Sequence, residues 1–404
     1  MPTYYRQLIY YNLDGTASAV KGSTLIGLED CDVAFRAAVL AAPEEKLTIE
    51  DVAIDEVPAG GVLVRIGAAG ICHTDLEVIS GQLKYPMPIT LGHEAAGTIE
   101  QVGLGVDPAR IGEKVVLSWN PHCGACPACE RGEAILCTRY LELGPKGVDF
   151  TGHTRLRSVA GEVHSMFFTA AFAEYAVVSS GCAIAIPPAM PLDRACLLGC
   201  GVMTGHGAIT NVSHVHLGDS VLVIGCGAVG LAAVQAAHLA GAGPVIAVDR
   251  DGPKLDLARE FGATHTINAL RDDVLSRVRD LTGRQGVDCV VEAAGSPSAL
   301  QLSVEVCRAG GEVIWLGKLG VDDDITFRWG ALMQEKRIRR NSYGNARPSR
   351  DFPALCRQYL AAELKLDQLI TARIPLEDIN DGFDALRGKR AIRTVIVLDE
   401  DLAQ

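Results

Sequence analysis

Four cysteines crowd one short stretch of the sequence, with the spacing C-x2-C-x2-C-x7-C: Cys123, Cys126, Cys129 and Cys137. Four thiolates suit a tetrahedral Zn²⁺ with no open position, and such a site orders a loop without doing chemistry. An iron–sulfur cluster is the alternative, because ferredoxin motifs also begin with C-x2-C-x2-C. The seven-residue gap and the lack of a following proline favour zinc. We therefore predict a structural zinc lobe at 123–137.

Three further candidate metal ligands lie far apart, each in a glycine-flanked turn: Cys72 in GICHTD, His93 in LGHEAAG and Cys200 in LGCGV. Two thiolates and one imidazole leave the fourth position of a tetrahedral zinc open, which is the pattern of a catalytic metal. Taken singly, a cysteine or a histidine is more often an ordinary buried side chain. Only the combination of the three predicts a catalytic site.

The segment Ser220–Asp249 has the pattern of a dinucleotide-binding unit. Two apolar runs, at 221–224 and 245–248, predict buried strands that flank an alanine-rich helix. The first strand runs into a G-x-G-x-x-G turn, in which the glycines permit a tight turn, close approach of a pyrophosphate and close helix packing. The N-terminus of the helix then offers free N–H groups to the phosphates. The cofactor contacts predicted from this turn are Gly225, Gly227, Val229 and Gly230.

Asp249 ends the second of these strands. A carboxylate there binds the adenosine ribose hydroxyls and repels a 2′-phosphate, so we expect NAD rather than NADP. The neighbouring Arg250 argues against this preference, so NADP stays the alternative.

The elements around these motifs fall into two kinds. Short strands separated by turns fill the region from residue 35 to about 203, and strands alternate with helices from 204 to 345. Alternation of this kind predicts an α/β protein with a doubly wound parallel sheet. Residues 1–34 show no periodicity and no chemical motif, and we treat them as an extension of unknown role.

Composition narrows the function further. The 404 residues are 48% hydrophobic and carry a formal net charge of −12, which argues against nucleic acid or an anionic membrane surface as partner. No apolar run approaches the roughly 20 residues of a membrane span. The N-terminus lacks a secretory signal, so we expect a cytoplasmic protein, in which the 13 cysteines suggest metal before disulfides.

The order GHE, cysteine lobe, GCGV-x-TG-x-G, G-x-G-x-x-G resembles the medium-chain zinc alcohol dehydrogenases, and most of all their long-looped, liver-type members. The resemblance covers about residues 35–404. It implies a GroES-like catalytic domain at 35–203 and 346–404 and a Rossmann domain at 204–345. It also implies two Zn²⁺ per chain, NAD as cofactor and a homodimer formed through the cofactor domain. The apolar segment Ile325–Met333 is a candidate dimer surface, with core packing as the alternative.

The resemblance also implies roles for residues around the metal. Thr74 would accept the hydroxyl proton, Asp75 would orient the His93 ring, and Glu94 would lie behind the metal. Glu77 stands where the family has a histidine that passes the proton on, so either Glu77 or water would carry it. The implied cofactor contacts outside the glycine turn are two cations toward the pyrophosphate and one toward the ribose: His73, Arg393 and Lys254.

Apolar side chains align with the family's substrate pocket: Leu83, Trp119, Met166 and Phe167. Such a pocket favours oxidation of an apolar primary alcohol, aromatic or of medium chain, to its aldehyde. The alternative is a thiol-adduct (S-hydroxymethyl) formaldehyde dehydrogenase. It is disfavoured because Leu83 and Leu141 are apolar where those members have polar entrance contacts. A non-catalytic dinucleotide-binding relative is the remote alternative, since such relatives usually lack the zinc ligands that this chain keeps.

Overall fold

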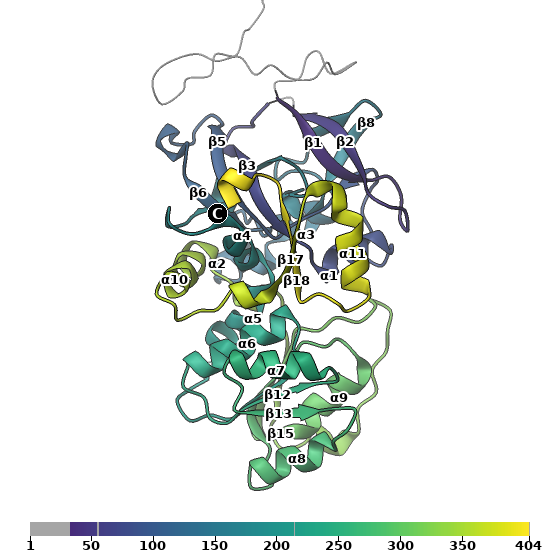
Figure 1. Cartoon of the computed structure of the whole chain (residues 1–404), viewed down its shortest axis with the longest axis vertical. Coiled ribbons are helices and arrows are strands. Elements are labelled where there is room, and N and C mark those ends of the chain that lie inside the picture. The colour runs from purple at the N-terminus through teal and green to yellow at the C-terminus, as the bar shows by residue number, and fades with distance from the viewer. Residues whose placement is uncertain (1–32, 55, 214, 404) are drawn as a thin grey trace, which may run out of the picture.

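The computed structural model describes residues 33–54, 56–213 and 215–403. Residues 1–32 of the N-terminal extension expected at 1–34 lie outside the described residues. In Figure 1 a β-rich part occupies the upper half of the view and a part built from alternating strands and helices occupies the lower half. This arrangement confirms the predicted fold class, an α/β protein with a β-rich domain and a doubly wound parallel sheet.

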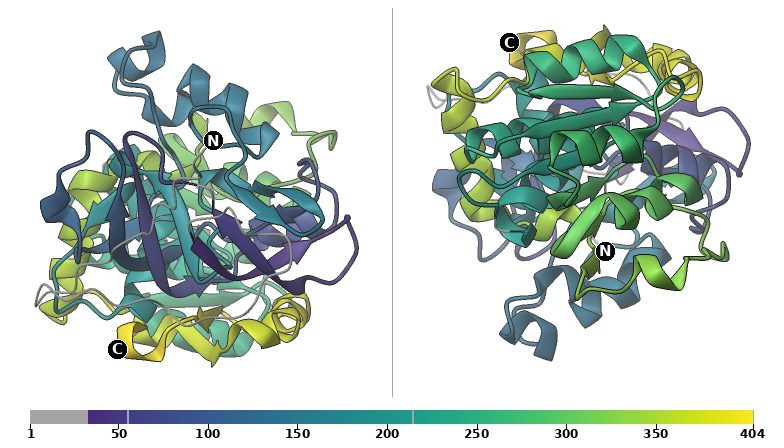
Figure 2. Two further views of the ribbon diagram at one scale, coloured as in Figure 1. Left: turned by 90° about the horizontal axis from the view of Figure 1, so that it is seen from above. Right: turned by 90° about the horizontal axis from the view of Figure 1, so that it is seen from below.

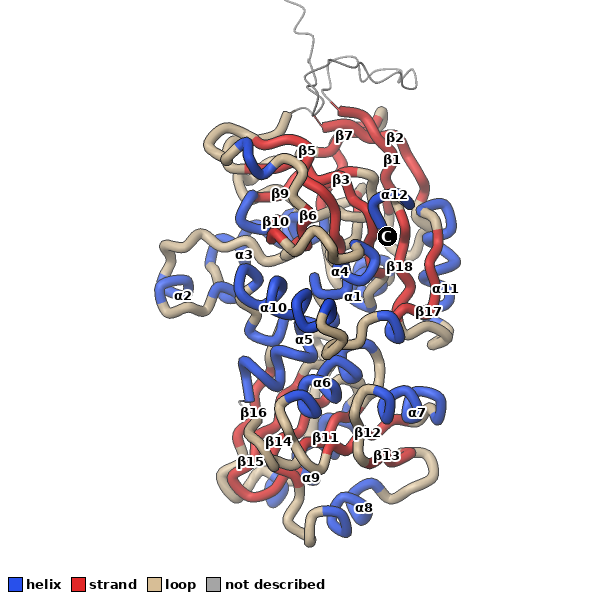
Figure 3. Tube along the Cα trace, turned by 60° about the vertical axis from the view of Figure 1, so that its left-hand side comes forward, coloured by secondary structure: helices blue, strands red, loops and turns tan. Residues whose placement is uncertain are grey.

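The β-rich part contains a small closed barrel and a larger sheet (Figure 3). The barrel has the order β1-β2-β7-β8-β4, with bounds Val33–Leu40, Thr48–Ile54, Leu156–Ser158, Gly161–Ser165 and Ile89–Thr90. The larger sheet has the order β10-β6-β5-β3-β18-β17, and β9 also pairs with β3. Its bounds are Ala183–Ala185, Lys114–Leu117, Ala95–Val102, Gly61–Gly70, Arg393–Val397, Ile370–Ile374 and, for β9, Tyr175–Ser179.

Short helices surround these sheets. The chain returns from the lower part to the β-rich part through α10, and the antiparallel pairing of β18 with β3 joins the C-terminal strand to the first half of the sequence. The helices of this part are α1 His73–Ile79, α2 Pro127–Glu130, α3 Thr138–Leu143, α4 Leu192–Ala195, α10 Pro348–Leu360, α11 Ile379–Arg387 and α12 Glu400–Ala403.

The lower part is a six-stranded sheet in the order β13-β12-β11-β14-β15-β16, and every pair is parallel. Seen from below, helices cover both of its faces (Figure 2). The order reverses between β11 and β14, and in such sheets ligands bind beside the carboxyl ends of the strands at the reversal. The strands are Val221–Ile224, Val245–Asp249, His265–Asn268, Val287–Glu292, Cys307–Trp315 and Arg337–Arg340, numbered β11 to β16. The helices are α5 Gly201–Gly207, α6 Ala228–Leu239, α7 Gly252–Glu260, α8 Val274–Leu281 and α9 Pro297–Val306.

The strands predicted at 221–224 and 245–248 form as expected, with every one of those residues buried. The sequence analysis missed β4, β7, β8, β16 and β17, most of which are too short or too charged to give a clear apolar signal. Strand β16 has the sequence Arg-Ile-Arg-Arg and lies at the edge of the sheet, where its side chains are largely exposed. Among the described residues, no helix is both long enough and apolar enough to cross a membrane.

Candidate active site

The glycine turn between β11 and α6 is tightly packed. Gly225 has φ +95°, a conformation that L side chains rarely adopt, and a Cβ there would approach the backbone nitrogen of Ala294 to 2.8 Å. A Cβ on Gly230 would lie 1.7 Å from the carbonyl oxygen of Gly225. Only glycine at both positions allows the chain to turn and α6 to pack on β11. Gly227 precedes α6 directly and has open space at its Cβ position, as close approach of a phosphate requires.

Asp249 lies at the carboxyl end of β12 and is hydrogen-bonded to the glycine turn. Its Oδ2 accepts the N–H of Cys226 at 2.7 Å, and its Oδ1 accepts the N–H groups of Arg250 at 2.7 Å and Asp251 at 2.9 Å. The carboxylate therefore fixes the turn and faces the same cleft as Lys254 on α7.

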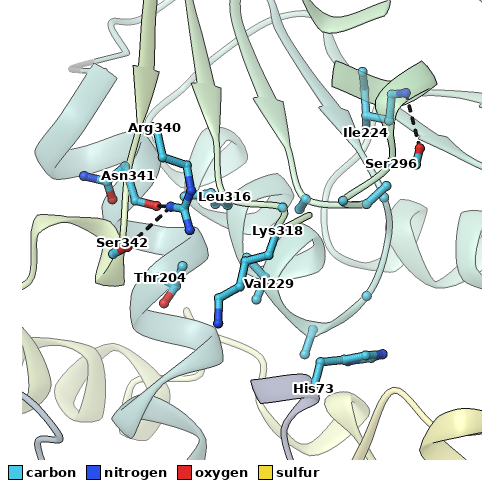
Figure 4. Close-up of a pocket in the computed structure, with 18 of the residues that line it drawn as sticks. His73, Thr204, Ile224, Val229, Ser296, Leu316, Lys318, Arg340, Asn341 and Ser342 are labelled. Atoms are coloured by element: carbon cyan, nitrogen blue, oxygen red, sulfur yellow. Dashed lines mark hydrogen bonds between the residues drawn. The ribbon is translucent and has the colours of Figure 1, made fainter. Parts of the chain in front are cut away.

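One cleft of about 2290 Å³ runs from the glycine turn to the predicted catalytic metal ligands. Residues of both parts line it, and Figure 4 shows the cofactor end with His73 of the β-rich part opposite Val229. The predicted site residues that line the cleft are Cys72, His73, Thr74, Glu77, His93, Trp119, Phe167, Cys200, Gly225, Gly227, Val229, Asp249, Lys254 and Arg393.

The three separated ligands meet in this cleft. Cys72 precedes α1, His93 lies between β4 and β5, and Cys200 precedes α5. Their ligand atoms all lie within 4.8 Å of one another. Cys72 and His93 are buried, and Cys200 is partly buried. Two thiols and an imidazole so close together fit a zinc ion with one open position.

Asp75 holds this ligand set in place. Its Oδ1 lies 3.2 Å from Nδ1 of His93, which leaves Nε2 of the ring free for a metal. The same carboxylate accepts the N–H groups of Cys72 at 3.0 Å and Gly92 at 3.2 Å. Burial lowers the pKa of His93, but the charge and hydrogen bond of Asp75 outweigh burial and raise it to about 10. Asp75, itself fully buried, holds the His93 ring in the orientation that a metal ligand needs.

The two thiols of the set are not equivalent. A hydrogen bond from Cys200 and the nearby His93 and Arg393 hold the pKa of Cys72 well below its usual range, against the effect of burial. Cys200 is the partner that keeps its proton, because the Cys72 thiolate and burial raise its pKa. A thiolate that forms readily at this position suits a cation, since metals bind the deprotonated thiol.

A buried ion pair lies behind these ligands. Arg393 Nε lies 3.0 Å from Glu94 Oε1, and Nη2 lies 3.0 Å from Oε2. Arg393 also donates to the carbonyl oxygen of Ile71, and Glu94 accepts the N–H of Gly201 at 3.1 Å. Burial raises the pKa of Glu94 to about 7 although Arg393 opposes the shift. The pyrophosphate contact expected for Arg393 stays a prediction, and the structure adds a partner that sequence analysis did not foresee.

Aromatic side chains form the wall next to His93. The ring of Phe167 lies 5.5 Å from that of His93 and 5.2 Å from that of Trp119, measured between centroids. Phe167 has φ +48°, a left-handed conformation that turns its ring into the cleft. Tyr343 lies 4.2 Å from Trp119 and also lines the cleft.

Two residues that we predicted to line the substrate pocket, Met166 and Leu83, do not line the cleft. Met166 is fully buried and packs in the core of the β-rich part, because the turn that carries Phe167 into the cleft directs its neighbour inward. Leu83 packs partly buried against the same core and does not line the cleft. Leu141, expected at the entrance, does line it.

The four-cysteine lobe projects from the β-rich part, with α2 at its outer end in Figure 3. Its four sulfur atoms lie within 4.8 Å of one another, and the distance between Cys126 and Cys129 is 3.5 Å. Backbone N–H groups of Cys129 and Thr138 lower the pKa of the Cys126 thiol to about 5. A set of four thiols, one of them readily ionised, fits a closed tetrahedral zinc site.

Two family models match this chain. The alcohol dehydrogenase GroES-like domain matches residues 58–188, and the zinc-binding dehydrogenase domain matches residues 228–361. The S-(hydroxymethyl)glutathione dehydrogenase of Aspergillus oryzae is 35% identical over 365 residues, which cover 89% of this chain and 95% of that protein. The chain belongs to the medium-chain zinc alcohol dehydrogenase family.

Solved structures of similar fold support this family assignment. An alcohol dehydrogenase zinc-binding domain protein from Burkholderia ambifaria has a TM-score of 0.87 and 36% identity, covering 91% of this chain and 100% of that chain. Benzyl alcohol dehydrogenase from Acinetobacter calcoaceticus has a TM-score of 0.86 and 30% identity, covering 91% and 99%. Other solved chains of this fold hold NADH or NADP. By its family this chain is therefore a zinc-binding dehydrogenase.

One residue of this alcohol dehydrogenase site escaped the sequence analysis. Lys318 follows β15, and its Nζ donates to Thr74 Oγ1 at 3.0 Å and to Glu77 Oε2 at 2.9 Å. Glu77 thus contacts a lysine of the other part of the molecule. The available signal was the position of Lys318 just beyond a parallel strand, at the sheet edge where ligands bind.

Proposed function

We propose that this protein interconverts a primary alcohol and its aldehyde, with NAD as cofactor and two zinc ions per chain. The observation that carries the proposal is the meeting of Cys72, His93 and Cys200 in the cleft that the glycine turn also lines. When bound, the zinc ion favours ionisation of the alcohol oxygen and the nicotinamide accepts the hydride.

The chain's own residues then bind, orient and move a proton. Cys72, His93 and Cys200 would hold the catalytic zinc, and Asp75 fixes the tautomer of the histidine. Thr74 is the hydroxyl available to take the alcohol proton, since its Oγ1 lies 3.9 Å from the Cys72 sulfur. The four thiols of the lobe would hold the second zinc.

Asp249 supports NAD rather than NADP. Its carboxylate lines the cleft at the end of β12, where a 2′-phosphate would meet a negative charge. His73 and Arg393 also line the cleft, and we propose them as partners of the pyrophosphate. Initial rates with NAD and NADP test this choice, and a preference for NADP would refute it.

For the substrate, a thiol-adduct alcohol is the first candidate. The curated relatives at 32–35% identity carry the name S-(hydroxymethyl)glutathione dehydrogenase. Charged side chains of both signs line the cleft, including Glu133 and Arg340, and would suit a substrate that bears carboxylate and ammonium groups. This first candidate replaces the apolar alcohol that the sequence analysis favoured.

An aromatic primary alcohol is the second candidate, because Trp119, Phe167 and Tyr343 form a ring-lined wall beside His93. The test is a comparison of kcat/KM, with NAD, for the adduct of formaldehyde and glutathione and for benzyl and cinnamyl alcohols. A thiol-adduct enzyme is expected to favour the adduct at least about tenfold, which is 1.36 kcal/mol in transition-state binding. The opposite ratio would establish the aromatic alcohol instead.

We also propose a homodimer formed through the parallel sheet. Strand β16 is the edge of that sheet and, within the described residues, pairs only with β15. In the nearby segment Ile325–Met333, the side chains of Trp329 and Met333 are 76% and 54% exposed. An open strand edge beside exposed apolar side chains favours association. Light scattering is expected to give twice the chain mass, and a monomer would refute the proposal.

A further inference from the structure

Lys318 connects the two parts of the molecule across the cleft. Its backbone packs closely against Gly295, where a Cβ would lie 2.7 Å from the Lys318 carbonyl oxygen. Its side chain extends from the end of β15 into the cleft (Figure 4). There its Nζ lies 3.0 Å from Thr74 Oγ1 and 2.9 Å from Glu77 Oε2, both on α1.

The chemistry of a lysine fixes the direction of these hydrogen bonds. An ammonium group has only donors, so the Thr74 oxygen and the Glu77 carboxylate both accept from it. One lone pair of the Thr74 hydroxyl is then occupied, and the hydroxyl hydrogen is free to point elsewhere. Thr74 lies beside Cys72, so the place where a reacting oxygen would meet the metal is within its reach. Glu77 is linked to Thr74 through Lys318.

Other charged and titratable groups lie around this contact. Glu77 is the carboxylate in direct contact with Lys318, and it holds the ammonium group next to Thr74. Two further groups interact with the charge of Glu77: His73, one turn earlier on α1, and Arg340 on β16, in the other part of the molecule. The Lys318 side chain is 41% exposed, so water can return a proton to it.

We propose that Lys318 is a positioning residue that fixes the Thr74 hydroxyl and supplies the proton that Thr74 gives to the reacting oxygen during carbonyl reduction. This inference rests on the proposed function, in which the cofactor supplies the hydride to the carbonyl carbon. As that C–H bond forms, the carbonyl π pair moves to oxygen, which takes the Thr74 hydroxyl proton. Thr74 takes a proton from Lys318 Nζ, and the neutral amine takes one from water. Alcohol oxidation runs the same transfers backwards.

Two substitutions of Lys318 separate proton supply from mere contact. Lys318→Met removes both hydrogen bonds while keeping an unbranched side chain. Lys318→Arg keeps donors that can reach Thr74 and Glu77, but a guanidinium does not give up its proton. The matched control is Lys146→Met, which breaks a Lys–Glu pair of 3.1 Å outside the cleft. Each variant is assayed for aldehyde reduction with NADH, for NADH affinity by fluorescence titration, and for its melting temperature.

We expect Lys318→Met to lower kcat for reduction about 100-fold, as loss of a proton-transfer group does, with KM, NADH affinity and melting temperature close to those of the wild type. Lys318→Arg is expected to stay at least about tenfold below the wild type, and Lys146→Met to equal it. Turnover of Lys318→Met within about threefold of the wild type, or full rescue by arginine, would overturn the inference. If Lys318→Met does not fold, the arginine variant alone decides. A wild-type protein without NADH-linked reduction would instead refute the proposed function.

Discussion

The two cysteine sites of this protein are built in opposite ways. The lobe draws four thiols from residues 123 to 137, on short turns at the molecular surface, with Cys123 exposed. The cleft site draws its ligands from three distant turns and surrounds them with buried carboxylates, Asp75 and Glu94. A closed thiol set needs only a local loop, whereas an open set needs the whole fold to orient its ligands. The first arrangement suits stability and the second suits chemistry.

Loss of a cleft ligand is expected to have the largest effect. Cys200→Ala removes one of three ligands, and turnover should fall about 1000-fold or more, because several kcal/mol of transition-state stabilisation depend on the metal. NADH should still bind, since the glycine turn is untouched. Steady-state kinetics and fluorescence titration check both expectations. Cys196→Ala, a buried cysteine outside both sets, is the control. If Cys200→Ala turned over about as fast as the control, the cleft site would not be catalytic, and the proposed difference between the two sites would be wrong.

Loss of a lobe ligand should affect stability more than turnover. Cys126→Ala is expected to lower the melting temperature, by about 2–4 °C for each kcal/mol lost. The value of kcat per folded molecule should stay within about threefold of the wild type, because no lobe cysteine lines the cleft. The KM for the substrate should rise, since Glu133 and Leu141 reach the cleft from the lobe and from α3. Scanning calorimetry and kinetics test this, and abolished turnover at an unchanged melting temperature would contradict it.

A smaller effect, on stability alone, is expected from a substitution of Asp149 in the turn that follows the lobe. Asp149 accepts the N–H groups of Thr151 at 2.7 Å and His153 at 3.0 Å, and the Nε of Arg155 at 2.6 Å. Burial raises the pKa of Asp149, but these hydrogen bonds and the charge of Arg155 outweigh burial and hold it below its usual range. A lowered pKa contributes stability above the unfolded value, about 3.9, and that contribution is lost as the pH falls through the folded pKa.

Asp149→Asn should therefore reduce the free energy of unfolding by about 1 kcal/mol at pH 7. The difference from the wild type should shrink as the pH falls below about 3.9. Urea denaturation at several pH values measures this difference. A difference that grows in acid would show that the carboxylate does not stabilise this turn.

Much of the fold could be predicted from the sequence because its decisive signals are local. The β-branched run at 221–224, the glycine turn and Asp249 lie within one short segment, and the fold class and family they indicate are confirmed. The cysteine spacing of the lobe is likewise a property of one loop. The three turns that carry Cys72, His93 and Cys200 were each recognisable, and the structure brings them together.

What could not be predicted depends on packing between distant segments. Glu94 and Arg393 are 299 residues apart in the sequence. The pairing of β3 with β18 on one side and with β5 on the other brings them together. Lys318 meets Thr74 across the cleft, which no local pattern records. Met166 and Phe167 are neighbours of similar character, and a left-handed residue in the turn decides which one enters the cleft.

Elemental analysis of the purified protein tests the account most directly. Two zinc ions per chain are predicted, with one remaining in Cys200→Ala and one in Cys126→Ala, and only the former variant should be inactive. One zinc per wild-type chain, or iron in place of zinc, would contradict the assignment of a structural and a catalytic site.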